Sequence, residues 1–533
     1  MFKRTAAIFG IFVFAAFFTA LAVLHLSAGG GLAEAAAQQQ TFTLTVSAGR
    51  GTVYDRSLGA MTGTGKEEYP AAVVPGDGAA AALTRACSAE KMKKIRTFLS
   101  AGRPFALKLP EAVSAPGIDV FPQRERYAPE SPAAHIVGYL DGSGNGAAGV
   151  EKAFDGFLSS GRGKVAVSYQ TDALGRVLSG QSETVADDSA ARRRGVVLTI
   201  DREAQQIAEQ SLARNLKKGA AVVLDVPSGK ILALASLPSF SQNDVAAVLK
   251  SADSPLLDRA VSAYSLGSVF KLVAAASALE YGISPDTEFT CTGAVDVDGQ
   301  AFHCYGGEKH GKENMKQAIA NSCNTYFIRL MQKVPQENFL RMAKQLGFGS
   351  PCEIAPGMTS GAGTLPSPDS LKVPRALANF SFGQGELTAT PLQTAALVNA
   401  VASGGIYTPP LLYEGEVDEN LHFTDRAQPR KGTRVMSEKT ASLLCGFMRA
   451  SAETGTGRKG KPDGVAAGVK TATAQTGQFV NGAELNDCWF AGFFPYEDPK
   501  YAVVVFSEGG DSGGAVCGPV FREIADGLCK SGD

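Results

Sequence analysis

The sequence predicts an α+β fold in which a five-stranded antiparallel sheet is sandwiched by helices. Two apolar runs surround a Pro-Ser-Gly turn in "GAAVVLDVPSGKILALAS" at residues 219–236, and this pattern predicts a hairpin. Three further strand-like runs, "GVKTATAQ", "DCWFAGFFP" and "YAVVVFSEG", succeed one another near the end of the chain, and "PVFREIADGLC" closes it as a helix. Because helical stretches fill the sequence between the two groups of strands, we expect helices to cover the sheet.

The composition is that of an ordinary globular chain, with 44% hydrophobic and 19% charged residues, so disordered and collagen-like classes are excluded. The 533 residues are enough for more than one domain. Fifty-one basic residues balance 52 acidic ones, and this balance predicts no nucleic-acid partner. The nine cysteines are too sparse for a disulfide scaffold and lack the short spacings of zinc motifs, so no metal site is expected.

The N-terminus carries a candidate membrane anchor. Thr19 is the one polar residue in "AAIFGIFVFAAFFTALAVL" at residues 6–24. Nineteen residues at about 1.5 Å each give roughly the thickness of the hydrocarbon core, and the run is longer than the core of a signal peptide. We predict a retained anchor over residues 1–27, with a cleaved signal as the alternative. Lys3 and Arg4 on the short side place residues 28 onward outside the cytoplasm.

Residues 28–190 differ in sequence pattern from the rest of the chain. A tether of small and polar residues leads into strand-like runs such as "TFTLTV" and "KVAVSYQ", which are separated by Gly-rich turns such as "DGSGNGAAG". The basic cluster "ARRRG" then precedes a strand and an amphipathic helix in "VVLTIDREAQQIAEQSLARNL". We therefore predict a separate β-containing domain at 28–190 and the main domain at 191–533.

A single charge stands in the apolar stretch "YSLGSVFKLVAAASAL" at residues 264–279, which predicts a helix inside the core. That charge is Lys271, and Ser268 lies one helical turn before it. Burial lowers the pKa of a lysine, and a neutral lysine can take the proton of a serine nucleophile. The alternative is a core serine beside a lysine that snorkels to the surface. The same spacing recurs in Ser88-Ala-Glu-Lys91, so spacing alone does not decide between these interpretations.

Two further clusters could complete such a site: "SCN" at residues 322–324 and "KTA" at residues 470–472. Each has counterparts elsewhere in the chain, such as "KTA" at 439–441, and singly each favours a structural interpretation. Their order strengthens the functional interpretation. A helix start, a loop between helices and the edge of a strand would bring all three to one place.

The three clusters, in this order, resemble the S-x-x-K, S-x-N and K-T-G motifs of the serine penicilloyl transferases. Within that group the chain resembles the class B penicillin-binding proteins, which are membrane-anchored peptidoglycan transpeptidases. "RGTVYDR" and "AAGVEKAFDGFLSSGRGK" resemble segments of their non-catalytic domain, and "FSFGQGELTATPLQTAALVNAVASGG" and "CWFAGFFP" recur in their catalytic domain. The resemblance implies a dimerisation-type pedestal at 28–190 and a penicillin-binding transpeptidase domain at 191–533.

The resemblance also implies a role for each residue of the first two motifs. Ser268 would attack the carbonyl of the penultimate D-alanine of a stem peptide and expel the terminal D-alanine. Lys271 would be the base for that step. Ser322 would relay a proton to the leaving amine, and Asn324 would hold Lys271 and the substrate amide.

The third motif supplies charge and hydrogen-bond donors in this interpretation. Lys470 would keep Lys271 neutral and attract the substrate carboxylate, with Thr471 as a hydroxyl donor. The backbone N–H groups of Ser268 and Thr473 would form the oxyanion hole. Ala472 departs from the family pattern, which has glycine there, and its methyl group is expected to crowd the substrate.

The resemblance implies a peptidoglycan D,D-transpeptidase that crosslinks stem peptides and is acylated by β-lactams, without cofactor or metal. The stem peptides would belong to lipid-linked or nascent glycan, and a polytopic membrane glycosyltransferase is the expected protein partner. The chain would be a single-pass protein of the bacterial cytoplasmic membrane with its catalytic domain outside.

Two alternative functions remain open. One is a hydrolase with the same acyl-enzyme, either a D,D-carboxypeptidase or a β-lactamase, which would need neither pedestal nor anchor. The other is a non-catalytic β-lactam sensor or scaffold. The presence of every motif residue argues against loss of catalysis, and the few residues before the membrane leave no room for a sensor's output domain.

Several residues near the motifs have other expected roles. An oxidising exterior would allow Cys291 and Cys304 to pair, whereas a reducing setting would leave them as thiols. Cys323 is interpreted as a packed small residue. His303 and His310 are expected to serve the structure or a substrate loop, because no ligand set is evident around them.

Overall fold

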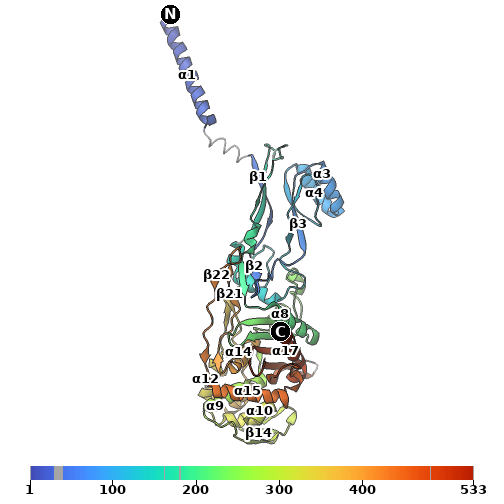
Figure 1. The fold of residues 1–533 in the computed structure, drawn as a ribbon, viewed down its shortest axis with the longest axis vertical. Coiled ribbons are helices and arrows are strands. Elements are labelled where there is room, and N and C mark those ends of the chain that lie inside the picture. Colours follow the sequence, from blue (N-terminus) through green and yellow to red (C-terminus); the bar gives the residue numbers. More distant parts are fainter. Residues whose placement is uncertain are drawn as a thin grey trace. The chain divides into compact units, whose positions relative to one another are not determined.

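The computed structural model describes residues 2–28, 40–160, 163–178, 180, 182–480 and 482–531. The chain forms two compact units (Figure 1). The smaller unit comprises residues 1–50, 65–125 and 161–192, and the larger unit comprises residues 51–64, 126–160 and 193–533.

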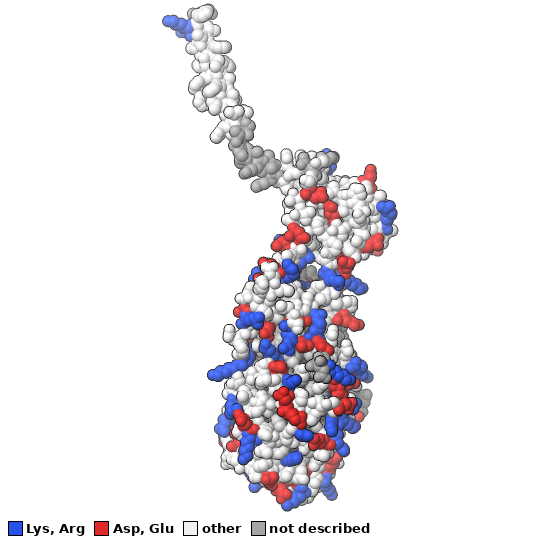
Figure 2. All heavy atoms as spheres, viewed as in Figure 1, with Lys and Arg blue, Asp and Glu red and all other residues white. Residues whose placement is uncertain are grey.

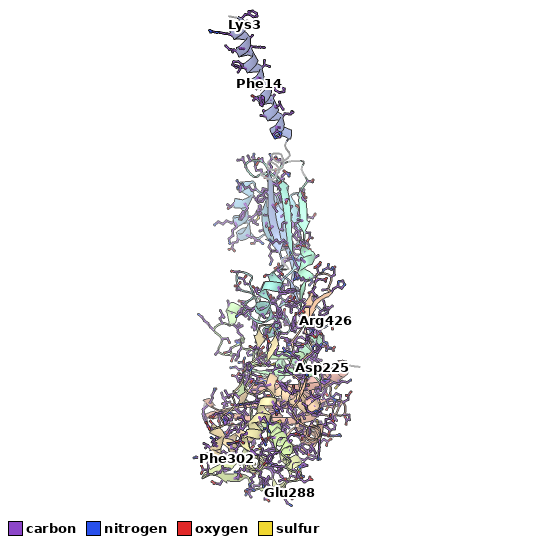
Figure 3. The ribbon with its side chains drawn as sticks, turned by 90° about the vertical axis from the view of Figure 1, so that its left-hand side faces the viewer. Lys3, Phe14, Asp225, Glu288, Phe302 and Arg426 are labelled. Atoms are coloured by element: carbon purple, nitrogen blue, oxygen red, sulfur yellow. The ribbon has the colours of Figure 1, made fainter. Side chains whose placement is uncertain are left out.

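Helix α1 (Phe2–Ala28) is long and apolar enough to cross a membrane, with a mean hydropathy of 2.6 over Phe2–His25. Its basic residues gather at its N-terminal end in Figure 2, and Lys3 and Phe14 are labelled on it in Figure 3. The predicted apolar span at residues 6–24 is therefore helical throughout.

The smaller unit is rich in strands, as its sequence predicts. Strands β1 (Thr41–Ala48), β7 (Lys164–Gln170) and β8 (Thr184–Asp187) form one antiparallel sheet. A second sheet has β3 (Glu67–Val73) between β4 (Phe105–Leu109) and β5 (Ile118–Val120), and β6 (Gln123–Arg124) also pairs with β3. Apolar residues of this second sheet form a core with α3 (Asp77–Ala86) and α4 (Ala89–Ala101).

The larger unit contains the predicted five-stranded sheet, and every pair of neighbouring strands is antiparallel. Its order is β11-β10-β26-β25-β24. Strands β10 (Gly219–Asp225) and β11 (Ile231–Leu237) form the predicted hairpin, and β24 (Gly468–Val480), β25 (Ala483–Phe494) and β26 (Tyr501–Glu508) are the three late strands. Strand β24 therefore lies at one edge of the sheet.

Side chains that alternate along the strands divide the core into two layers. On β26, Val503 and Val505 belong to a cluster with α8 (Arg202–Asn215) and α17 (Gly518–Ser531). Ala502, Val504 and Phe506 belong instead to the large cluster that contains α9 (Lys271–Glu280) and α14 (Pro391–Ala402). Helices therefore cover both faces of the sheet, as predicted (Figure 1).

The two units are not separated by one boundary at residue 190. Strand β2 (Thr52–Tyr54) pairs in parallel with β9 (Gly195–Leu198), whose other neighbour is β21 (Tyr413–Val417). This pairing explains why residues 51–64 belong to the larger unit. Within the same unit, Glu151 is fully buried and pairs with Arg126. Part of the segment expected to form the pedestal, residues 126–160, therefore belongs to the unit that contains the five-stranded sheet.

Charges of both signs occur on the visible face of the larger unit. Acidic and basic side chains are interspersed on the face drawn in Figure 2, in keeping with the net charge of −1.

Candidate active site

Ser268 lies in a short 3-10 turn, η3 (Gly267–Phe270), that leads directly into α9. The segment from 264 was expected to be one helix, but β12 (Tyr264–Ser265) precedes the turn. Gly267 has a φ of +64°, a conformation that glycine adopts without strain. Helix α9 is buried on all sides over residues 271–278, as its apolar sequence predicts.

Lys271 does not reach the surface; its side chain is fully buried. Its Nζ lies 2.9 Å from Ser268 Oγ and donates hydrogen bonds to Ser322 O and Asn324 Oδ1, both at 2.6 Å. Of the two interpretations offered by the sequence, the snorkelling lysine is therefore excluded. The ammonium is held against the serine by acceptors from the second motif.

The second motif bridges α10 (Met315–Ala320) and α11 (Asn324–Met331). Between them, Ser322 adopts a φ of +58°, which is strained for a residue with a side chain and is often seen at functional sites. Asn324 Nδ2 donates to His303 O at 2.9 Å, which fixes the amide so that its oxygen faces Lys271.

Lys470 approaches from β24 and is also fully buried. Its Nζ donates to Ser322 Oγ at 2.9 Å and to Thr471 O at 2.7 Å, while Lys271 Nζ lies 3.3 Å from the same hydroxyl oxygen. The Ser322 hydroxyl therefore connects the two lysines.

Two buried ammonium groups this close repel one another. Burial lowers the pKa of Lys271 to about 8. Burial, followed by the charge of Lys271, lowers the pKa of Lys470 well below its usual range. The expected assignment, a charged Lys470 beside a neutral Lys271, stays a prediction, and in the free chain no described anion contacts Lys470.

The remaining residues of the third motif line the same strand edge. The hydroxyls of Thr471 and Thr456 lie 2.7 Å apart, and Thr473 Oγ1 accepts a hydrogen bond from Gly513 N at 3.1 Å. Ala472 is buried, and its methyl group faces Gly267: a Cβ built on that glycine would lie 3.4 Å from Ala472 Cβ. The methyl group thus packs on the turn that carries Ser268.

A cleft of about 890 Å³ brings the three motifs together. Each predicted site residue that is not fully buried lines it, namely Ser268, Ser322, Asn324, Thr471 and Thr473. His303, for which a structural or substrate-loop role was expected, also lines it. Other side chains of its wall were not predicted from the sequence: Tyr305, Glu308, Asn379, Gln384, Glu484 and Asn486. Of these, Gln384 had a usable signal, because it lies in the "FSFGQG" segment that resembles the family.

A cluster of sulfur and nitrogen atoms lies beside the cleft. The Sγ atoms of Cys291, Cys304 and Cys323 and a ring nitrogen of His310 all lie within 4.8 Å of one another. The expectation that no ligand set surrounds the histidines is therefore wrong for His310; His303 is not part of the cluster. No sequence motif pointed to the cluster, because the four residues come from separate segments. Cys291 and Cys304 are free thiols.

Comparisons with known proteins agree on one family. The family model for the penicillin binding protein transpeptidase domain matches residues 219–526. The peptidoglycan D,D-transpeptidase PbpA of Mycolicibacterium smegmatis is 31% identical over 411 residues, which cover 71% of this chain and 82% of that protein.

Solved structures share the fold. Penicillin-binding protein A from M. tuberculosis, solved as a ceftriaxone acyl-enzyme complex, is 25% identical with a TM-score of 0.65, over 76% of this chain and 93% of that one. A chain of a peptidoglycan synthase complex that coordinates polymerisation and crosslinking has a TM-score of 0.70 at 24% identity, over 98% of both chains.

Proposed function

This chain belongs to the penicillin-binding protein transpeptidase family, as a class B member, and from that premise we propose that it crosslinks peptidoglycan through an acyl-enzyme on Ser268. The observation that carries the proposal is the fully buried Lys271 Nζ, 2.9 Å from Ser268 Oγ. A serine hydroxyl is a weak nucleophile until a neighbouring base takes its proton, and this lysine is within reach to do so.

In the first step Ser268 Oγ attacks the carbonyl carbon of the penultimate D-alanine, and its proton passes to Lys271. Negative charge then develops on the carbonyl oxygen. The N–H groups of Ser268 and Thr473 are the proposed donors to that oxygen. Strand β24 supports this assignment because it is the edge strand, so alternate N–H groups along it have no neighbouring strand as partner.

Ser322 is the proposed route for the proton to the leaving group. Its hydroxyl lies within 3.3 Å of Lys271 Nζ and 2.9 Å of Lys470 Nζ. As the C–N bond breaks, the nitrogen of the terminal D-alanine takes a proton from Ser322, which regains one from a lysine. The products of this half-reaction are D-alanine and an ester on Ser268.

Substrate binding itself would prepare the base. The carboxylate of the terminal D-alanine, bound near Lys470 and Thr471, supplies the anion that Lys470 lacks in the free chain. That anion raises the pKa of Lys470, and the resulting charge disfavours a second ammonium on Lys271. In the complex with substrate we therefore expect a charged Lys470 and a neutral Lys271.

The second half-reaction transfers the acyl group to an amine of another stem peptide and restores the Ser268 hydroxyl. A β-lactam would acylate the same oxygen, but its leaving nitrogen stays tethered in the opened ring.

The apolar helix α1 would anchor the chain with Lys3 and Arg4 in the cytoplasm and the cleft outside. The smaller unit would then be the pedestal, and a polytopic membrane glycosyltransferase the partner that supplies nascent glycan.

The test uses the full chain in detergent with a fluorescent penicillin and intact-mass detection. We expect one stable adduct, which Ser268→Ala abolishes. The chain is then supplied with glycan polymerised from lipid-linked precursor, and crosslinked dimers are separated from trimmed monomers. Crosslinked dimers support the transpeptidase; an adduct that fades within minutes, or release of D-alanine without dimers, would instead establish the hydrolase alternative.

A further inference from the structure

Four side chains that bind metals in other proteins converge behind the second motif. Cys291 ends β13 (Phe289–Cys291), Cys304 follows β15 (Gln300–His303), His310 precedes β16 (Gly311–Glu313) and Cys323 precedes α11. Phe302 on β15 and Glu288, just before β13, mark this region in Figure 3. We propose that the three thiolates and the imidazole bind one zinc ion, and that this ion fixes the second motif in place.

Three of the distances between the four groups match those of a tetrahedral site, and all of them are within 4.8 Å. Cys304 Sγ lies 3.7 Å from Cys291 Sγ and 3.8 Å from Cys323 Sγ, and Cys291 Sγ lies 3.4 Å from His310 Nδ1. Sulfur ligands at about 2.3 Å from a zinc ion, at the corners of a tetrahedron, are about 3.8 Å apart, and a sulfur and a nitrogen ligand are about 3.5 Å apart. A disulfide would need about 2.05 Å between the sulfurs.

The burial and the chemical type of the four ligands favour zinc. The three cysteines are at most 3% exposed, and His310 is 10% exposed. Soft thiolate ligands favour zinc over magnesium, calcium or manganese, which prefer oxygen, and three cysteines with one histidine are a common structural zinc set. Binding releases three thiol protons to solvent and forms three Zn–S bonds and one Zn–N bond, with no change of oxidation state.

Groups around the cluster are placed as supports for a metal site. The second ring nitrogen of His310, Nε2, lies 3.3 Å from Glu308 Oε2 without hydrogen-bond geometry, and a small movement of this exposed carboxylate would let it orient a ligating imidazole. Thr325 Oγ1 lies 3.4 Å from Cys323 Sγ, within reach of a hydroxyl donor to a thiolate. Packing alone gives no reason for a histidine to face three buried sulfurs.

The effect on the active site comes from the position of Cys323, between Ser322 and Asn324. Those neighbours give Lys271 Nζ its two acceptors at 2.6 Å, and Ser322 holds a strained φ of +58°. An ion bonded to Cys323 and Cys304 would tie this segment to the β15 end, where His303 O accepts from Asn324. This positioning role rests on the proposed function, whereas metal binding does not.

The first measurement is the metal content of the full chain, purified in detergent under reducing conditions with zinc in the growth medium. We expect about one zinc ion per chain by mass spectrometry of the elements. Replacement of zinc by cobalt(II) should give the intense visible bands of a tetrahedral site and a thiolate-to-cobalt absorption in the near ultraviolet. This spectroscopic result needs no variant and does not depend on catalysis.

Variants then assign the ligands. Cys291→Ser and His310→Ala should each lower the bound metal at least tenfold, whereas the matched control Cys352→Ser should retain it, because Cys352 lies outside the cluster.

Removal of zinc by a chelator should slow acylation by penicillin at least tenfold, and zinc should restore it. Failure to bind zinc or cobalt with all thiols reduced, or a stable Cys291–Cys304 disulfide in the reduced preparation, would overturn the proposal. Stoichiometric metal with acylation unchanged by the chelator would overturn the positioning role alone.

Discussion

Lys271 Nζ lies 2.9 Å from Ser268 Oγ, within direct hydrogen-bond reach of the hydroxyl. Lys271→Ala removes the base and should slow acylation by penicillin about 10²- to 10⁴-fold, the usual contribution of a positioned base. The second-order rate constant with a fluorescent penicillin measures this.

Lys91→Ala is the matched control, since it belongs to the other Ser-x-x-Lys of the chain. Ser88 there caps α4 by accepting a hydrogen bond from Lys91 N, and the lysine side chain is not buried. Its rate should equal that of the unmodified chain. Equal slowing in the two variants would contradict the assignment of Lys271.

The acylation rate should rise with pH in the range in which Lys271 loses its proton. Burial lowers the pKa of Lys271 to about 8, so the neutral base is a minor form at pH 7 and the major form at pH 9. We expect the rate to increase about fivefold from pH 7 to pH 8 and to level off above pH 9. Burial is the main cause of this value, and the charges of Cys323, Cys304 and Glu313 oppose it. A pH profile that is flat between 7 and 9 would contradict a lysine base.

Gly267→Ala should disturb the turn that carries the nucleophile. The added Cβ would lie 3.0 Å from Ala474 Cβ and 3.4 Å from Ala472 Cβ, at a φ of +64°. Left-handed backbone costs alanine about 1–2 kcal/mol, and the overpacking costs about 1–3 kcal/mol more. A displaced Ser268 should acylate at least tenfold more slowly, because small misplacements of reacting groups are costly.

Gly282→Ala separates the two causes of that effect. Gly282 also has a positive φ, +96°, but a Cβ there meets nothing within 4 Å. Urea unfolding should therefore show a loss of about 1–2 kcal/mol for this variant, with an unchanged acylation rate. If the two alanine variants behave alike, contact with Ala472 and Ala474 is not what constrains the turn.

The sequence was sufficient for the sheet and for the convergence of the three motifs, because their signals are local. Apolar and strand-like runs marked all five strands, and the apolar helix around Lys271 marked a buried charge. The metal-ligand cluster could not be predicted, since Cys291, Cys304, His310 and Cys323 lie 13, 6 and 13 residues apart and meet only through tertiary packing. The assignment of residues 51–64 to the larger unit likewise depends on a parallel pairing of β2 with β9, more than 140 residues apart in sequence.

The lowered pKa of Lys470 also could not be predicted from the sequence. A motif gives residue types, whereas the pKa of Lys470 depends on complete burial and on the distance to Lys271 through Ser322. Ala472 lines the cleft, so the expected crowding of the substrate by its methyl group stays a prediction. Its contact with the Ser268 turn comes from the register of β24 against η3, which spacing does not reveal.

Asp487 makes the stability of the larger unit depend on pH. Burial raises the pKa of this carboxyl to about 7, although Ser265 N donates to Oδ2 at 3.1 Å. The folded chain thus keeps the proton up to about pH 7, whereas the unfolded chain releases it near pH 4. Its contribution to folding is fully present below pH 4 and is lost as the pH rises to 7, by up to about 1.4 kcal/mol per pH unit.

Asp487→Asn should remove that dependence, because an amide has no proton to lose and its oxygen still accepts from Ser265 N. Relative to the unmodified chain, the variant should gain more stability to urea at pH 8 than at pH 5. Asp498→Asn, at an exposed position, is the control and should leave the pH dependence unchanged. Because Ser265 lies three residues before Ser268, a gain in stability at pH 8 without a change in acylation rate would place Asp487 in folding alone. Parallel urea curves for the unmodified chain and Asp487→Asn at both pH values would show that the carboxyl is already ionised in the folded chain at pH 5.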